Sequence, residues 1–110
     1  MVGLTNEALL TNLETIVRQE ITVYAAYSFT SKLYCITDDA QKLYAVISVP
    51  NQPHSRPVKV IVMAQVNKDK VVILEDVTDK PLVDALMVNA GIAREKIVLA
   101  YRGETMSGIG

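Results

Sequence analysis

The stretch at residues 78–104, TDKPLVDALMVNAGIAREKIVLAYRGE, decides the fold that the sequence predicts. Apolar residues recur at helical spacing over about 81–89, and the run IVLAY at 97–101 has the length and the partly β-branched composition of a strand. Gly91, between them, can adopt the left-handed backbone conformation that ends many helices. The stretch therefore predicts a helix, a glycine stop, a one-turn bridge and a final strand. Such a unit offers packing surfaces and contains no residue set that performs chemistry.

The start of this helix carries its own signals. Thr78 or Asp79 is expected to cap the first-turn amides with a side-chain oxygen, because these amides have no partner within the helix. Pro81 fits in the first turn for the same reason, since its missing N–H is not needed there.

Upstream of this unit the sequence predicts a long amphipathic helix and then four strands. The expected ranges are about 6–24 for the helix and 33–37, 43–49, 58–66 and 71–75 for the strands. Polar turns at 38–39 (DD) and 67–70 (NKDK) predict two hairpins, and three prolines in the loop 50–57, PNQPHSRP, interrupt strand pairing between them. The order α-β-β-β-β-α-β predicts one α+β domain over residues 1–110, with a mainly antiparallel sheet packed by the two helices.

The predicted strands are apolar on both faces. In the run 58–66, Val60 and Val62 belong to one face, while Ile61 and Met63 belong to the other. An antiparallel sheet with one solvated face normally alternates apolar and polar residues. Either the two helices cover both faces, or another subunit covers one of them. A symmetric dimer is the commonest arrangement of the second kind, so we expect a homodimer.

Composition narrows the function classes. The chain has 110 residues, of which 11 are basic and 12 acidic, and the basic residues are scattered along it. Direct nucleic-acid binding is disfavoured, because such proteins usually show a basic excess that neutralises phosphates. The start MVGLTNEALL lacks the basic and apolar parts of a secretion signal, and no apolar run reaches membrane-spanning length. The single cysteine, Cys35, suits a reducing compartment, so we expect a cytoplasmic protein without a membrane partner.

The search for chemistry favours structural roles. His54 is the only histidine and falls in a proline-rich loop, without a nucleophile motif that would place it in a catalytic triad. Cys35 lies within a strand, where a lone cysteine usually behaves as a small buried hydrophobe. Four carboxylates around the second helix match no calcium-loop spacing and fit capping and dipole roles instead: Glu75, Asp76, Asp79 and Asp84. We therefore expect no enzyme, no catalytic residue, no metal and no cofactor.

Two segments carry a resemblance to a known family. The ending GIAREKIVLAY at 91–101 and the run IVRQEITVYAAY at 16–27 resemble the XisI family of element-excision controlling factors from cyanobacteria. The resemblance implies an accessory protein without catalytic residues, acting with a nuclease-like XisH-type partner in the controlled excision of a DNA element. The chain departs from the family pattern in having no tryptophan, in reading VVILED at 71–76, and in ending in ETMSGIG.

Other functions stay open beside this one. A nuclease-like partner and a small regulator could also form an antitoxin-like pair, and a pocket between sheet and helices could serve a small-molecule sensor. If a partner surface lies near the last strand, the first residues to test are Arg94, Tyr101 and Arg102. Exposed arginine and tyrosine are enriched at the hot spots of interfaces.

Overall fold

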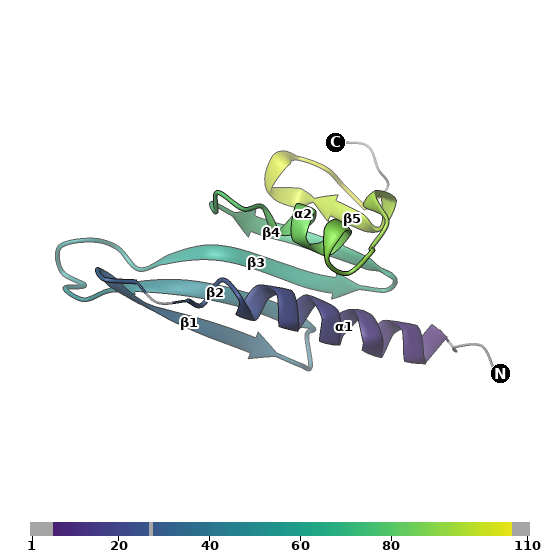
Figure 1. Ribbon diagram of the computed structural model, residues 1–110, viewed down its shortest axis with the longest axis horizontal. Coiled ribbons are helices and arrows are strands. Elements are labelled where there is room, and N and C mark those ends of the chain that lie inside the picture. The colour runs from purple at the N-terminus through teal and green to yellow at the C-terminus, as the bar shows by residue number, and fades with distance from the viewer. Residues whose placement is uncertain (1–5, 27, 107–110) are drawn as a thin grey trace.

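The computed structural model describes residues 6–26 and 28–106, which form two helices and one five-stranded sheet (Figure 1). The elements are, in chain order, α1 (Asn6–Thr22), β1 (Ser31–Asp38), β2 (Leu43–Pro50), β3 (Lys59–Asn67), β4 (Lys70–Asp76), α2 (Leu82–Val88), η1 (Arg94–Lys96), β5 (Ile97–Leu99) and η2 (Ala100–Arg102), where η marks a one-turn 3-10 helix. The predicted order α-β-β-β-β-α-β is confirmed. Within the described ranges, no helix is long and apolar enough to cross a membrane.

The sheet has the strand order β1-β2-β3-β4-β5. The first three pairings are antiparallel, and β4 pairs with β5 in parallel. A parallel pair needs a crossover connection, and α2 lies in that connection. In the β1–β2 turn, the Asp38 side-chain Oδ1 accepts the Gln41 backbone N–H at 3.1 Å, as the predicted Asp-Asp turn requires.

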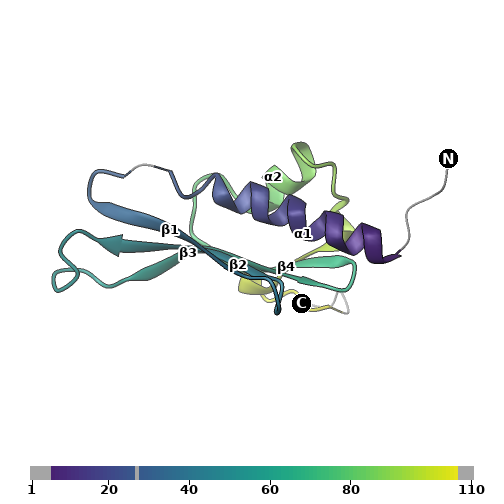
Figure 2. The same ribbon diagram turned by 90° about the horizontal axis from the view of Figure 1, so that it is seen from below.

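Both helices pack on the same face of the sheet, as the turned view shows (Figure 2). Of the two arrangements left open by the sequence, coverage of both faces by helices is therefore wrong. Part of the other face, near β4, is crossed by the segment that follows β5 (Figure 2). The core lies between the helices and the sheet, and its fully buried members include Val17, Ile21, Tyr44, Leu82 and Leu86.

An irregularity in the register of β2 and β3 modifies the predicted faces. Between β2 and β3, Val46 pairs with Val62 and Ile47 with Val60, so Ile61 is an extra residue on β3. A bulge of this kind turns the local side chains, and Ile61 packs against the core instead of lying on the opposite face. The face predicted for Ile61 is therefore wrong.

The start of α2 differs from the prediction that Thr78 or Asp79 caps it. The residue before the helix is Pro81, which supplies no side-chain hydrogen bond. The carboxylate of Asp76, at the end of β4, takes this role across the turn: its Oδ2 accepts the Leu82 N–H at 2.7 Å. Its Oδ1 accepts the N–H and the hydroxyl of Thr78, at 2.9 and 2.6 Å. One side chain therefore fixes the strand end, the turn and the first turn of the helix.

The end of α2 agrees with the prediction, and the end of the last strand does not. Gly91 has a φ of 68°, the left-handed conformation expected of it. Its N–H donates to the Met87 carbonyl at 3.2 Å. The last strand ends at Leu99, two residues earlier than predicted, because the Leu99 backbone turns to a ψ of 76° and the chain continues as η2.

Tyr24 connects the end of α1 to the start of α2. Its hydroxyl donates to the Lys80 carbonyl at 2.5 Å. Burial, followed by the nearby negative charge of Asp76, raises the pKa of Tyr24 from 10.0 to about 12.

A raised pKa in the folded state makes a prediction for alkaline solution. The stabilising effect of the protonated phenol is complete below pH 10 and is lost as the pH rises through about 12. We expect Tyr24→Phe to remove the component near pH 12 from the ultraviolet titration of tyrosinate. Burial also raises the pKa of Tyr44, and its late ionisation should persist in the variant. The variant should also lose stability less steeply than the parent above pH 10, so equal slopes would contradict the assignment.

Candidate functional site

The three residues predicted as a partner surface all belong to the segment that surrounds β5. Arg102 is exposed, and its guanidinium carbon lies 5.6 Å from the centre of the Tyr101 ring, in cation–π geometry. Tyr101 is half-buried and packs against the core. The Arg94 guanidinium donates to the Ile97 carbonyl at 2.7 Å and to the Glu104 carboxylate at 2.6 Å. Tyr101 and Arg102 thus form one surface feature, while Arg94 holds the segment that presents it.

Glu104 closes this segment from the other side. Its Oε1 accepts the Leu99 N–H at 3.0 Å, and its own N–H donates to the Leu99 carbonyl at 3.1 Å. Gly103 makes the return possible with a φ of 93°. The bond from the Leu99 amide, followed by the bond from Arg94, lowers the pKa of Glu104 below its ordinary value of 4.5.

The lowered pKa predicts an acid-sensitive C-terminal segment. A carboxylate of this kind stabilises the fold above its unfolded-state pKa, near 4.5, and loses that effect as the pH falls through its lower folded-state value. We expect the melting temperature of the parent to fall more steeply below pH 4.5 than that of Glu104→Gln, which has no charge to lose. Melting curves measured from neutral pH into acid test this expectation. Parallel curves for the two proteins would show that Glu104 does not contribute to the acid response.

The residues considered for catalysis lie apart from one another. His54 is exposed in the loop between β2 and β3. Cys35 is half-buried in β1, with its Sγ 3.6 Å from the Thr22 hydroxyl oxygen. Of the four carboxylates near α2, Asp76 has the structural role described above. Within the residues described, no group of three histidine, cysteine or carboxylate side chains is placed to hold a metal ion.

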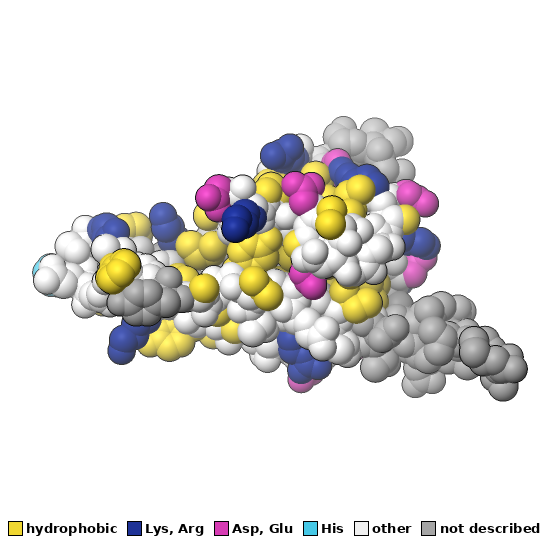
Figure 3. Space-filling model, viewed as in Figure 1, with side chains coloured by type: hydrophobic (Ala, Val, Ile, Leu, Met, Phe, Trp, Pro, Cys, Tyr) yellow, Lys and Arg dark blue, Asp and Glu magenta, His cyan; other side chains and the backbone are white. Residues whose placement is uncertain are grey.

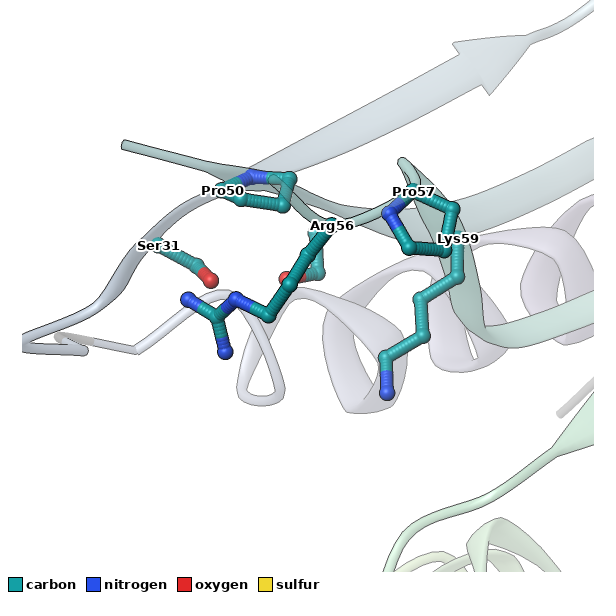
Figure 4. Close-up of a pocket in the computed structure, with 6 residues that line it drawn as sticks. Ser31, Pro50, Arg56, Pro57 and Lys59 are labelled. Atoms are coloured by element: carbon teal, nitrogen blue, oxygen red, sulfur yellow. The ribbon is translucent and has the colours of Figure 1, made fainter. Parts of the chain in front are cut away.

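A small pocket lies at the end of the sheet where β1 begins and β2 ends. Its volume is about 100 Å3, and it is lined by Ser31, Ser48, Pro50, Arg56, Pro57 and Lys59. The side chains of Arg56, from the loop between β2 and β3, and of Lys59, at the start of β3, point to the same side in the close-up view (Figure 4). The Arg56 guanidinium donates to the Thr30 carbonyl at 3.1 Å, which fixes one of its nitrogens and leaves its other donors for a ligand.

The charge around this pocket has one sign. The sequence contains no acidic residue at 21–37 or at 40–68, the segments that build this end of the molecule. On the face shown in Figure 3, the same end carries basic side chains and no acidic ones. Neither Arg56 nor Lys59 belongs to an ion pair among the described residues. Two cations and two serine hydroxyls are donors suited to one anionic group.

Sequence reasoning did not find this pocket. In the sequence, the loop 50–57 stands out for its prolines and for His54, and nothing there assigns a role to Arg56. Ser31, Ser48 and Lys59 come from three different strands, and only the register that pairs Ser48 with Lys59 brings them together.

A protein-family model matches most of the chain. The model of the family described as XisI protein matches residues 8–109. A search of curated proteins gives no match.

Two solved structures share the fold. An XisI-like protein from Anabaena variabilis ATCC 29413 superposes with a TM-score of 0.72 at 24% identity, over 82% of this chain and 84% of that one. The fdxN element excision controlling factor XisI from the same organism superposes with a TM-score of 0.70 at 24% identity, over 93% of this chain and 99% of that one. The α+β arrangement of two helices and a mostly antiparallel sheet is common to them and this chain.

Proposed function

This chain belongs to the XisI family, and from that premise we propose that it is a non-enzymatic accessory factor in the controlled excision of a DNA element. The observation that carries the proposal is the family match over residues 8–109. The shared fold with a protein named as an excision controlling factor supports it. A factor of this kind acts through another protein, and we propose a nuclease-like partner of the XisH type in the cytoplasm.

The surface proposed for this partner is the turn that follows β5. The pair of Tyr101 and Arg102 offers an aromatic ring with a charged, exposed guanidinium over it. Residues of these types contribute strongly to interfaces.

Affinity capture of the tagged protein from its own cells tests the proposal. We expect a nuclease-like protein to be retained in stoichiometric amount and identified by mass spectrometry. Retention of the tagged chain alone would remove the proposed partner. If the partner is found, DNA cleavage measured with and without this chain separates an excision factor from an antitoxin-like inhibitor, because only the inhibitor suppresses its partner's activity.

Variants of the purified protein locate the surface. Arg102→Ala and Tyr101→Ala are expected to weaken partner binding, measured by calorimetry, by about tenfold or more each. Arg56→Ala is the matched control, since it removes an exposed arginine from a different part of the fold and should leave the affinity unchanged. Arg94→Ala is less informative because it also releases Glu104. If Arg102→Ala and Tyr101→Ala bound the partner as tightly as the control Arg56→Ala, the partner would bind elsewhere on the molecule.

The pocket beside Arg56 supports a second candidate function, the sensing of a small anion. A volume of about 100 Å3 is well below that of pockets that enclose whole metabolites, so a single anionic group fits better. Inorganic phosphate is the probe of choice, compared with chloride at equal ionic strength. A sensor predicts a rise in melting temperature with phosphate that is lost in Arg56→Ala, whereas equal melting temperatures in the two salts would reject it.

A further inference from the structure

The edge strand β1 has one side without a partner. It pairs only with β2, and all eight residues of Ser31–Asp38 follow this pairing without a shift. Figure 1 shows β1 along the lower border of the molecule. Within the described residues no other strand bonds to its outer side. An edge of this length, free of proline and of bulges, is a ready template for another strand.

The other edge of the sheet is different. Strand β5 has three residues, all of them buried, and the segment after it turns back through Glu104. Strand β1 is therefore the edge that is open to a partner.

The side chains of β1 show what kind of partner fits. On the face without helices, Tyr34 and Ile36 are 45% and 49% exposed, which is unusual for adjacent large apolar positions on one strand face. Lys32 precedes them and Asp38 follows them on the same face. Neither charge has an ion-pair partner among the described residues. Along this face, every second residue of β1 therefore presents in turn a cation, an aromatic ring, an aliphatic side chain and an anion.

We propose that two copies of this chain pair through β1 as antiparallel strands, with Cys35 facing its counterpart in the second copy. This pairing sets Lys32 opposite Asp38 twice and Tyr34 opposite Ile36 twice, so that charges and apolar side chains complement each other. It extends the two five-stranded sheets into one of ten strands. The proposal depends on β1 alone and is independent of the proposed nuclease-like partner.

Symmetry restricts the register to a few choices. Residues opposite each other in an antiparallel pair point to the same face, and a two-fold axis perpendicular to the sheet keeps both pairs of helices on one face. The axis must therefore pass through a residue position and not between two residues. Centred on Tyr34, the pairing would set Lys32 against Ile36; centred on Ile36, it would set Asp38 against Tyr34. Only the centre at Cys35 matches opposite charges.

Cys35 is the single cysteine of the chain, so a disulfide between the two copies would report this register directly. Opposed residues of an antiparallel pair have Cα atoms about 4.5–5.5 Å apart, within the range of about 4.4–6.8 Å that a disulfide spans. We expect mild oxidation of the full-length protein at micromolar concentration to give a disulfide-linked dimer, seen on a non-reducing gel.

Relocated cysteines distinguish the proposed register from random collision. In a Cys35→Ser background, Tyr34→Cys and Ile36→Cys should each fail to cross-link alone and should cross-link when the two proteins are mixed. Cross-linking of Tyr34→Cys or Ile36→Cys with itself would show a different centre and overturn the proposed register.

Charge reversal tests the same interface without oxidation. Lys32→Asp and Asp38→Lys should each raise the dissociation constant of the dimer about tenfold or more, because each places like charges opposite one another at two symmetric positions. The double variant should return toward the parent value, since the pairs are restored in reverse. Light scattering and sedimentation measure these constants. A parent protein that stays monomeric at high micromolar concentration, or a double variant no tighter than the single ones, would refute the pairing.

Discussion

Replacing Leu86 by alanine is expected to lower the free energy of unfolding by about 2–5 kcal/mol. Leu86 lies on α2 with no exposed surface and belongs to the core cluster together with Val17 and Ile21 of α1 and with residues of the sheet. Alanine removes buried methyl groups and leaves a cavity that the surrounding elements cannot fully close. The effect is large because α2 has seven residues, too few to be stable without its packed face.

Urea denaturation followed by circular dichroism measures this loss. Val88→Ala is the matched control, since Val88 lies on the same helix with 81% of its surface exposed. Its free energy of unfolding should stay within about 0.5 kcal/mol of the parent value. Similar losses for the two variants would mean that α2 does not pack through Leu86 as described.

The elements of the fold could be predicted from the sequence because their signals are local. Apolar spacing marks α1 and α2, and turn residues such as Asp38 and glycine stops such as Gly91 mark the boundaries. The positions that were predicted wrongly depend on contacts between segments. Leu99 ends the last strand because Glu104 binds it from five residues further along, and periodicity within the strand contains no sign of that contact.

The candidate sites show the same limit. Residue type and position near the last strand grouped Arg94, Tyr101 and Arg102, but only the folded structure separates Arg94, which holds the segment, from the pair that the segment presents. The face left open by the helices could be suspected from strands that are apolar on both sides. Its free edge at β1 depends on the strand order, which the order of elements along the chain did not determine.

Asp76→Ala is expected to cost about 2–3 kcal/mol of stability, because hydrogen bonds to a charged group contribute about 1.5–3 kcal/mol and this carboxylate accepts three. Partial burial leaves water only limited access to the Leu82 and Thr78 donors that would lose their acceptor. Asp76→Asn keeps one acceptor oxygen and should lie between the alanine variant and the parent. Chemical denaturation of the three proteins gives the comparison.

Asp79→Ala is the control for this series, because Asp79 is exposed and lies in the same turn. Its stability should change by no more than about 0.5 kcal/mol. If Asp76→Ala proved as stable as this control, the Asp76 carboxylate would contribute nothing to stability, and Pro81 alone would start the helix. Tyr24 supplies an independent readout, since the charge of Asp76 helps to raise the pKa of its phenol. Asp76→Asn should therefore shift the tyrosine titration to lower pH. That shift would show that Asp76 lies close to Tyr24 at the junction between α1, β4 and α2.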